Sequence, residues 1–77
     1  MKKFSKVKML ERIKSEGRMD LVGKEELAIM DDLDGQDAVE SCWARRVYGN
    51  PVLWVVGKSG EGHYVNENDC EEKGGDI

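Results

Sequence analysis

The chain has 77 residues, with 12 Lys and Arg against 16 Asp and Glu, so its formal net charge is −4. Hydrophobic residues make up 39% of the sequence and charged residues 36%, which is typical of one small globular domain. A TIM barrel or a doubly wound nucleotide-binding sheet needs a much longer chain, so these catalytic folds are excluded.

The amino-terminal segment is basic, whereas the rest of the chain is acidic. Residues 1–18 contain seven bases and two acids, a net of +5, and residues 19–77 have a net of −9. Apolar residues recur at every third position of this segment, at Phe4, Val7, Leu10 and Ile13. Ser5 is a suitable N-cap and Gly17 a suitable stop. The sequence therefore predicts an amphipathic helix over residues 5–16.

Residues 21–70 are expected to form a small β body. The apolar run 27–30, followed by the Asp-rich segment 31–37, favours a strand and a turn. Helix over 24–33 is the competing interpretation, because several residues of this segment have high helix propensity. Alternation of apolar and polar residues over 39–47 predicts the next strand.

The last strands are indicated by the clearest patterns in the chain. Val52–Val56 is a β-branched, apolar run, and 63–65 is expected to return beside it after a Gly-rich turn over 57–62. A helical turn or a bend is expected over 66–70, and 71–77 is expected to be a frayed tail.

Four short strands joined by tight turns predict an α+β fold, in which the N-terminal helix packs on a small, strongly bent antiparallel sheet. The order of elements resembles that of SH3-like small barrels. The residues that carry the resemblance are Val22-Gly23-Lys24, the turn Asp34-Gly35, the paired strands around 57–62 and the closing Tyr64-Val65-Asn66-Glu67-Asn68-Asp69. The resemblance implies an SH3-like barrel, with a plain four-stranded meander as the alternative. It implies no site for proline-rich peptides, because the closely spaced aromatic residues of that site are absent.

Two motifs resemble ligand-binding loops but lack their required residues. Gly57-Lys58-Ser59 matches the end of a phosphate-binding loop, yet Val52 stands where the first glycine is needed, and a hairpin turn is expected. The segment 31–35 resembles a calcium loop, but Met30 and Ser41 occupy its required carboxylate positions. We expect a solvated acidic loop and no metal or cofactor, with one alternative, a weak cation site among its four acids. These acids are Asp31, Asp32, Asp34 and Asp37.

Cys42 and Cys70 are expected to be two thiols, as in most cytosolic chains, with a Cys42–Cys70 disulfide as the alternative. Two isolated cysteines and one histidine do not have the pattern of a zinc site. A thiol enzyme that uses either cysteine with His63 as its base is one functional hypothesis. The acidic body disfavours it, because a reactive thiolate needs electropositive surroundings.

The basic segment offers a second hypothesis, a factor associated with nucleic acid. Its candidate phosphate contacts are Lys2, Lys3, Lys6 and Lys8. The competing interpretation is a docked helix whose lysines face solvent or pair with acids of the body.

Aromatic and arginine residues are enriched where proteins bind one another. One arrangement turns alternate residues of the apolar strand, Val52, Trp54 and Val56, toward the core. Leu53 and Val55 then face outward and need a cover, supplied by the N-terminal helix or by a second copy in a homodimer. The candidate partner-binding residues are Trp43, Arg45, Arg46, Leu53 and Trp54.

No stretch has the length of a secretory core or a membrane span, so the protein is expected in the cytoplasm and not at a membrane. The leading functional hypothesis is a non-enzymatic, acidic protein-interaction module with a protein partner. Small acidic chains of this kind are associated with accessory proteins of bacteria and their mobile elements.

Overall fold

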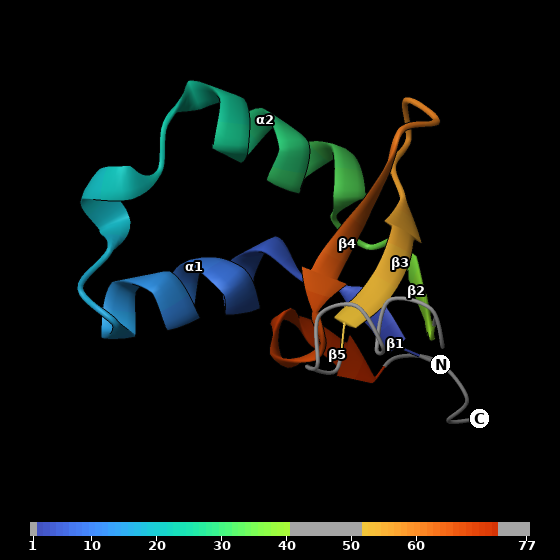
Figure 1. Ribbon diagram of the computed structural model, residues 1–77, viewed down its shortest axis with the longest axis horizontal. Helices are drawn as coiled ribbons and strands as arrows, with labels where there is room; N and C mark the ends of the chain where they lie inside the picture. Colours follow the sequence, from blue (N-terminus) through green and yellow to red (C-terminus); the bar gives the residue numbers. More distant parts are fainter. Residues whose placement is uncertain (1, 41–51, 73–77) are drawn as a thin grey trace.

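The computed structural model of the protein describes residues 2–40 and 52–72 (Figure 1). Its elements, in chain order, are β1 (Lys2–Phe4), α1 (Lys6–Ser15), the 3-10 turn η1 (Met19–Leu21), α2 (Lys24–Leu33), β2 (Asp37–Glu40), β3 (Val52–Val56), β4 (Gly62–Asn66), the 3-10 turn η2 (Glu67–Asp69) and β5 (Cys70–Glu72).

All described strand pairs are antiparallel and form one sheet in the order β4-β3-β2-β1-β5. Both helices lie to one side of this curled sheet and are joined through η1 (Figure 1). The predicted α+β class, with a helix packed on a bent antiparallel sheet, is confirmed.

The sheet has five strands where the sequence predicted four. The additional strands are β1 and β5, which pair with each other from Lys2 opposite Glu72 to Phe4 opposite Cys70. Residues 71 and 72, expected in a frayed tail, therefore belong to the sheet. A three-residue strand is too short to show an alternating pattern, so only its partners reveal it.

The first predicted helix is confirmed. The Ser5 hydroxyl accepts a hydrogen bond from the Lys8 amide at 3.2 Å, which caps the N-terminus of α1. Gly17 follows the helix with a φ of 70°, a left-handed conformation that glycine adopts at low cost.

The strand predicted over residues 27–30 is wrong, because this segment is the middle of α2. The Glu26 carboxylate accepts a hydrogen bond from the Gly23 amide at 2.8 Å, an N-terminal contact that favours a helix start. Its most buried apolar side chains are spaced three apart, at Leu27, Met30 and Leu33. The helix extends into the segment that was expected to be an acidic turn.

The predicted strands over 52–56 and 63–65 are confirmed as β3 and β4. β2 covers the beginning of the strand expected over 39–47, and the remainder of that segment lies outside the described residues. The helical turn expected after β4 is η2.

The core lies between the helices and the inner face of the sheet. Its buried apolar residues are Phe4, Met30, Leu33, Ala38, Leu53, Val55, Val65 and Cys70. Leu53 and Val55, at 3% and 0% exposure, therefore face the helices, and Trp54 faces the other way. The helices supply the cover that these two side chains need.

Candidate functional site

The two lysines at the start of the chain lie on β1 and not on the basic helix, and each is paired with a carboxylate. Lys2 Nζ lies 3.1 Å from Glu67 Oε2, and Lys3 Nζ donates to Asp37 Oδ1 at 2.6 Å. Both acids belong to the body of the protein: Asp37 lies on β2, which pairs with β1, and Glu67 lies on η2.

The two candidate lysines on α1 are also bound within the molecule. Lys6 Nζ donates to Asp31 Oδ1 at 2.5 Å, and its amide donates to Asp34 Oδ1 at 2.9 Å. Lys8 Nζ donates to the Cys70 carbonyl at 3.0 Å. All four candidate phosphate contacts thus bind acceptors of the protein itself. On α1, only Lys6 pairs with an acid, the contact that the docked-helix interpretation expects, and Lys8 binds a main-chain carbonyl.

An ion pair between the partly exposed Arg12 and the buried Asp69 holds α1 against η2. Arg12 donates from Nε to Asp69 Oδ1 at 2.6 Å and from Nη2 to Asp69 Oδ2 at 3.0 Å, and Asp69 is 1% exposed. This hydrogen bonding raises the pKa of Arg12 above its already high ordinary value. Because both oxygens of the buried carboxylate accept hydrogen bonds from one guanidinium, we interpret this pair as structural.

Cys70 is a buried free thiol whose sulfur lies 3.8 Å from the Asn66 carbonyl oxygen. Burial, together with the nearby Asp69 carboxylate, raises its pKa to about 11. A nucleophilic cysteine needs the opposite shift, so these surroundings disfavour a thiol enzyme based on Cys70. Cys42 lies outside the described residues.

The Gly57-Lys58-Ser59 motif forms the turn between β3 and β4, and no helix follows it. The Ser59 amide and hydroxyl donate to the two Asp32 carboxylate oxygens at 2.8 and 2.7 Å. These bonds lower the pKa of Asp32, with the hydroxyl as the main cause. The turn binds a carboxylate of α2, and this contact fastens the hairpin to the end of that helix.

Each of the four acids considered as a cation site already accepts a hydrogen bond from another residue. Asp31 and Asp34 are bound by Lys6, Asp32 by Ser59 and Asp37 by Lys3. Within residues 2–40 and 52–72, no group of three or more His, Cys, Asp or Glu side chains is placed to hold a metal ion.

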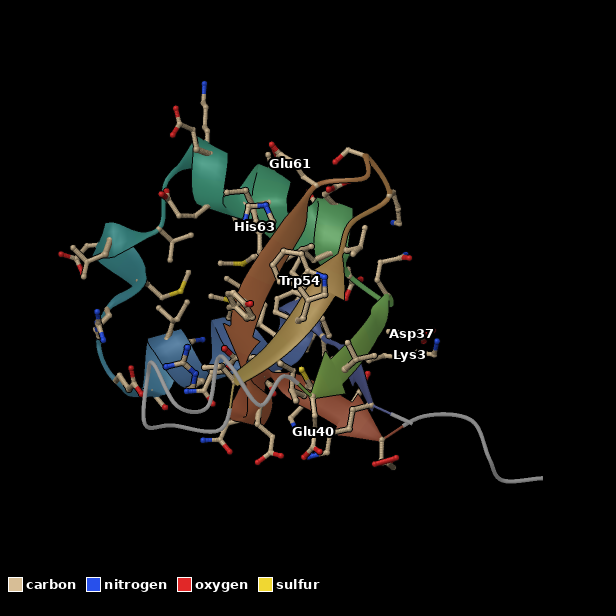
Figure 2. The ribbon with its side chains drawn as sticks, turned by 45° about the vertical axis from the view of Figure 1, so that its right-hand side comes forward. Lys3, Asp37, Glu40, Trp54, Glu61 and His63 are labelled. Carbon is tan, nitrogen blue, oxygen red and sulfur yellow. The ribbon has the colours of Figure 1, made fainter. Side chains whose placement is uncertain are left out.

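The outer face of the sheet, opposite the helices, carries an exposed apolar row. Val39 on β2 lies opposite Trp54 on β3, and Trp54 lies opposite Tyr64 on β4. We call these three residues the aromatic row. Val39 is 48% exposed and Tyr64 37% exposed, and the Trp54 and Tyr64 ring centroids are 4.8 Å apart. Trp54 lies over the sheet on the side away from the helices (Figure 2).

The candidate partner-binding residues are only partly brought together. Trp54 is on the outer face, as a binding residue needs to be, whereas Leu53 is buried in the core and is removed from the candidate surface. Trp43, Arg45 and Arg46 lie outside the described residues. Sequence reasoning missed Val39 and Tyr64, which only the strand register places beside Trp54.

An apolar pocket of about 160 Å³ lies on the other side of the sheet, between β4 and α2. His63 and Val65 line it from β4, and Ile29 and Met30 line it from α2. His63 is directed toward α2 (Figure 2), whereas the ring of the next residue, Tyr64, contacts that of Trp54.

Comparison of the chain with protein-family models, curated proteins and solved structures found no significant match in any of the three. Among the described segments, none of the helices combines the length and apolar character that crossing a membrane requires.

Proposed function

We propose that this protein is a non-enzymatic interaction module that binds a protein partner through the outer face of its sheet. The observation that carries this proposal is the aromatic row, in which the Trp54 and Tyr64 rings contact each other at a tilt of 58° on an exposed sheet surface. Trp and Tyr are the residue types that most often dominate binding energy at protein interfaces.

The distribution of charge supports a protein partner over a nucleic acid. The lysines that would bind phosphate are engaged with the body, and the chain as a whole carries −4. A polyanion would have to displace these internal contacts, whereas a basic protein surface is attracted by the net charge. The nucleic-acid factor therefore stays the less supported hypothesis.

The proposal is tested by comparing three forms of the immobilised chain in affinity capture. Tyr64→Ser removes one aromatic ring from the outer face. Val7→Ser is the matched control, because Val7 is an exposed apolar residue of α1, at 62% exposure. We expect a specific partner to be retained by the native chain and by the control, and to be lost with Tyr64→Ser. Equal retention by all three forms would refute the proposal.

A further inference from the structure

The turn that joins α2 to β2 places an aspartate directly before a glycine, at Asp34 and Gly35. Gly35 has a φ of 80°, a left-handed conformation that favours glycine. The Asp34 carboxylate accepts a hydrogen bond from the Lys6 amide, one of the first amides of α1, which have no acceptor within their own helix. The fold therefore uses both residues. Together they also form a reactive sequence, because glycine has no side chain to hinder closure of the aspartate side chain on the main chain.

We propose that Asp34 is a site of spontaneous isomerisation to isoaspartate, and that its contacts with Phe4 and Lys6, together with that of Gly35, suppress the reaction in the folded protein. In this reaction the Gly35 nitrogen attacks Asp34 Cγ and a carbon–nitrogen bond forms. One carboxyl oxygen leaves as water with the amide proton and the carboxyl proton. Water then opens the cyclic imide at the main-chain carbonyl, so the chain runs through the side-chain carbons and the mass is unchanged. The reaction needs only water and is independent of the proposed interaction function.

The backbone of Asp34 is far from the conformation that closes this ring. A five-membered ring needs the Gly35 nitrogen to eclipse Asp34 Cβ about the Cα–C bond, and the tetrahedral geometry of an L-residue puts this position at a ψ of about −120°. Asp34 has a ψ of 127° in the structure. The Cα–C bond of Asp34 therefore has to rotate by more than about 100° before the nitrogen can reach Cγ.

Both reacting groups are also held by the amino-terminal segment. The Gly35 amide, which contains the nucleophile, donates to the Phe4 carbonyl at 2.9 Å, and the Asp34 carboxylate accepts from the Lys6 amide at 2.9 Å. The Phe4 amide donates to the Gln36 carbonyl at 3.0 Å, and the Phe4 side chain is buried in the core. Rotation at Asp34 requires these contacts to break, so the reaction needs residues 4–6 to leave the turn.

The rate of isomerisation should follow the fraction of time that residues 4–6 spend away from the turn. When opening and closing are fast relative to a chemical step, the rate of that step is proportional to the population of the open form. β1 lies between β2 and β5 and pairs with both, so this opening also breaks strand pairs. Isoaspartate at position 34 would therefore accumulate in chains that open often, and only slowly in chains that stay folded.

The product would not fit the native turn. The Gln36 amide donates to the Leu33 carbonyl at 3.0 Å, and the Gly35 amide donates to the Phe4 carbonyl, so these two hydrogen bonds fix the length of the main chain around position 34. Isoaspartate adds one carbon to the main chain at this point and carries its carboxylate directly on Cα. The contact with the Lys6 amide is then lost, and the chain cannot return to its native hydrogen bonds.

The first measurement compares the folded and the unfolded chain at the same pH and temperature, in buffer and in urea. Isoaspartate is counted by tryptic peptide mapping with electron-transfer fragmentation, which distinguishes it from aspartate of equal mass. We expect isomerisation at Asp34 to be at least about tenfold faster in urea than in buffer. In urea, Asp31, Asp32 and Asp37 are internal controls that should react more slowly, because residues larger than glycine follow them. Equal rates at Asp34 in the two states, or no isoaspartate at Asp34 in urea, would overturn the proposal.

Two variants at Lys6 test the contact with α1. Lys6→Pro removes the amide that donates to Asp34, and proline is well tolerated as the first residue of a helix. Ser5 is extended, with a ψ of 113°, as a residue before proline should be. Lys6→Ala is the matched control, because it loses the Nζ bond to Asp31 but keeps the amide.

Thermal melts show that both Lys6 variants are folded at the temperature of the incubation. Loss of one hydrogen bond to Asp34 should make Lys6→Pro isomerise at least about threefold faster in buffer than Lys6→Ala. Equal rates in the two folded variants would overturn the proposal. If Lys6→Pro does not fold, the comparison of buffer with urea decides, because it uses the native chain.

Discussion

Replacement of Arg12 by Met is expected to be among the most damaging single changes in the described structure. It removes both hydrogen bonds to Asp69 and leaves a carboxylate of 1% exposure without a cation. Removing one partner of a buried ion pair costs about 3–5 kcal/mol, and we expect the lower figure, about 3 kcal/mol, because Arg12 itself is partly exposed.

This loss is large for so small a protein. A domain of 77 residues has a free energy of unfolding of about 4–12 kcal/mol. A loss of about 3 kcal/mol then lowers the melting temperature by about 12–24 °C. Urea unfolding followed by circular dichroism, with thermal melts on the same samples, measures both quantities.

Two further variants separate the buried pair from a simple loss of charge. Arg12→Met with Asp69→Leu removes both charges, so it should recover much of the stability lost in the single variant. Glu16→Ala removes only the exposed partner of Arg12, four residues along α1, and should cost less than about 0.5 kcal/mol. The reasoning is refuted if Arg12→Met lies within about 0.5 kcal/mol of the native chain.

Three other predictions have defined outcomes. Gly62→Ala would place a Cβ 2.1 Å from Trp54 Cζ2, so the indole ring must move. The near-ultraviolet circular dichroism of Trp54 should therefore change. An unaltered spectrum would contradict the packing of Trp54 on Gly62. Cys70 should react slowly with a thiol reagent at pH 8, and a rate equal to that of the unfolded chain would contradict its burial. Because its pKa is raised from 9.0 to about 11 in the folded protein, the contribution of the neutral thiol to the free energy of unfolding should be lost as pH rises through that window. Because the pKa of Asp32 is lowered, its contribution to the free energy of unfolding is present above the ordinary carboxyl pKa and is lost as pH falls through the lowered value. Ser59→Ala should weaken this acid sensitivity, measured as the melting temperature against pH. An unchanged pH profile would count against the contact.

Local signals were sufficient to predict α1, β3 and β4. Ser5 caps the helix, the β-branched residues Val52, Val55 and Val56 favour a strand, and the glycines after Val56 favour a turn. In each case, the residues that determine the element lie within it or next to it in the chain. Neighbouring residues were therefore enough to predict these elements.

A helix over 24–33 was the competing interpretation, and the strand was preferred because the apolar run 27–30 is short and its apolar residues do not lie on one helical face. The amino-terminal contact of Glu26 lies before the run, and the buried Leu33 lies after it. The complete segment shows spacings of three that a four-residue window hides.

The candidate site depended on which face of β3 was covered. Alternation shows that Leu53 and Trp54 point to opposite sides, but it does not say which side meets the helices. The register of β2 and β4 with β3 determines the aromatic row, and these pairings join residues far apart in the chain. The resemblance to SH3-like small barrels stays a prediction.

The position of β1 between β2 and β5 has a consequence for synthesis in the cell. Lys2 emerges from the ribosome first among the described residues, yet its strand partner Glu72 emerges last among them. Phe4 has one flanking strand missing until Cys70 has been translated, so nascent chains expose part of the apolar interior for most of elongation. Such distant pairings also slow folding after release. The chain is thus most vulnerable to proteases and to aggregation before residue 72 has left the exit tunnel.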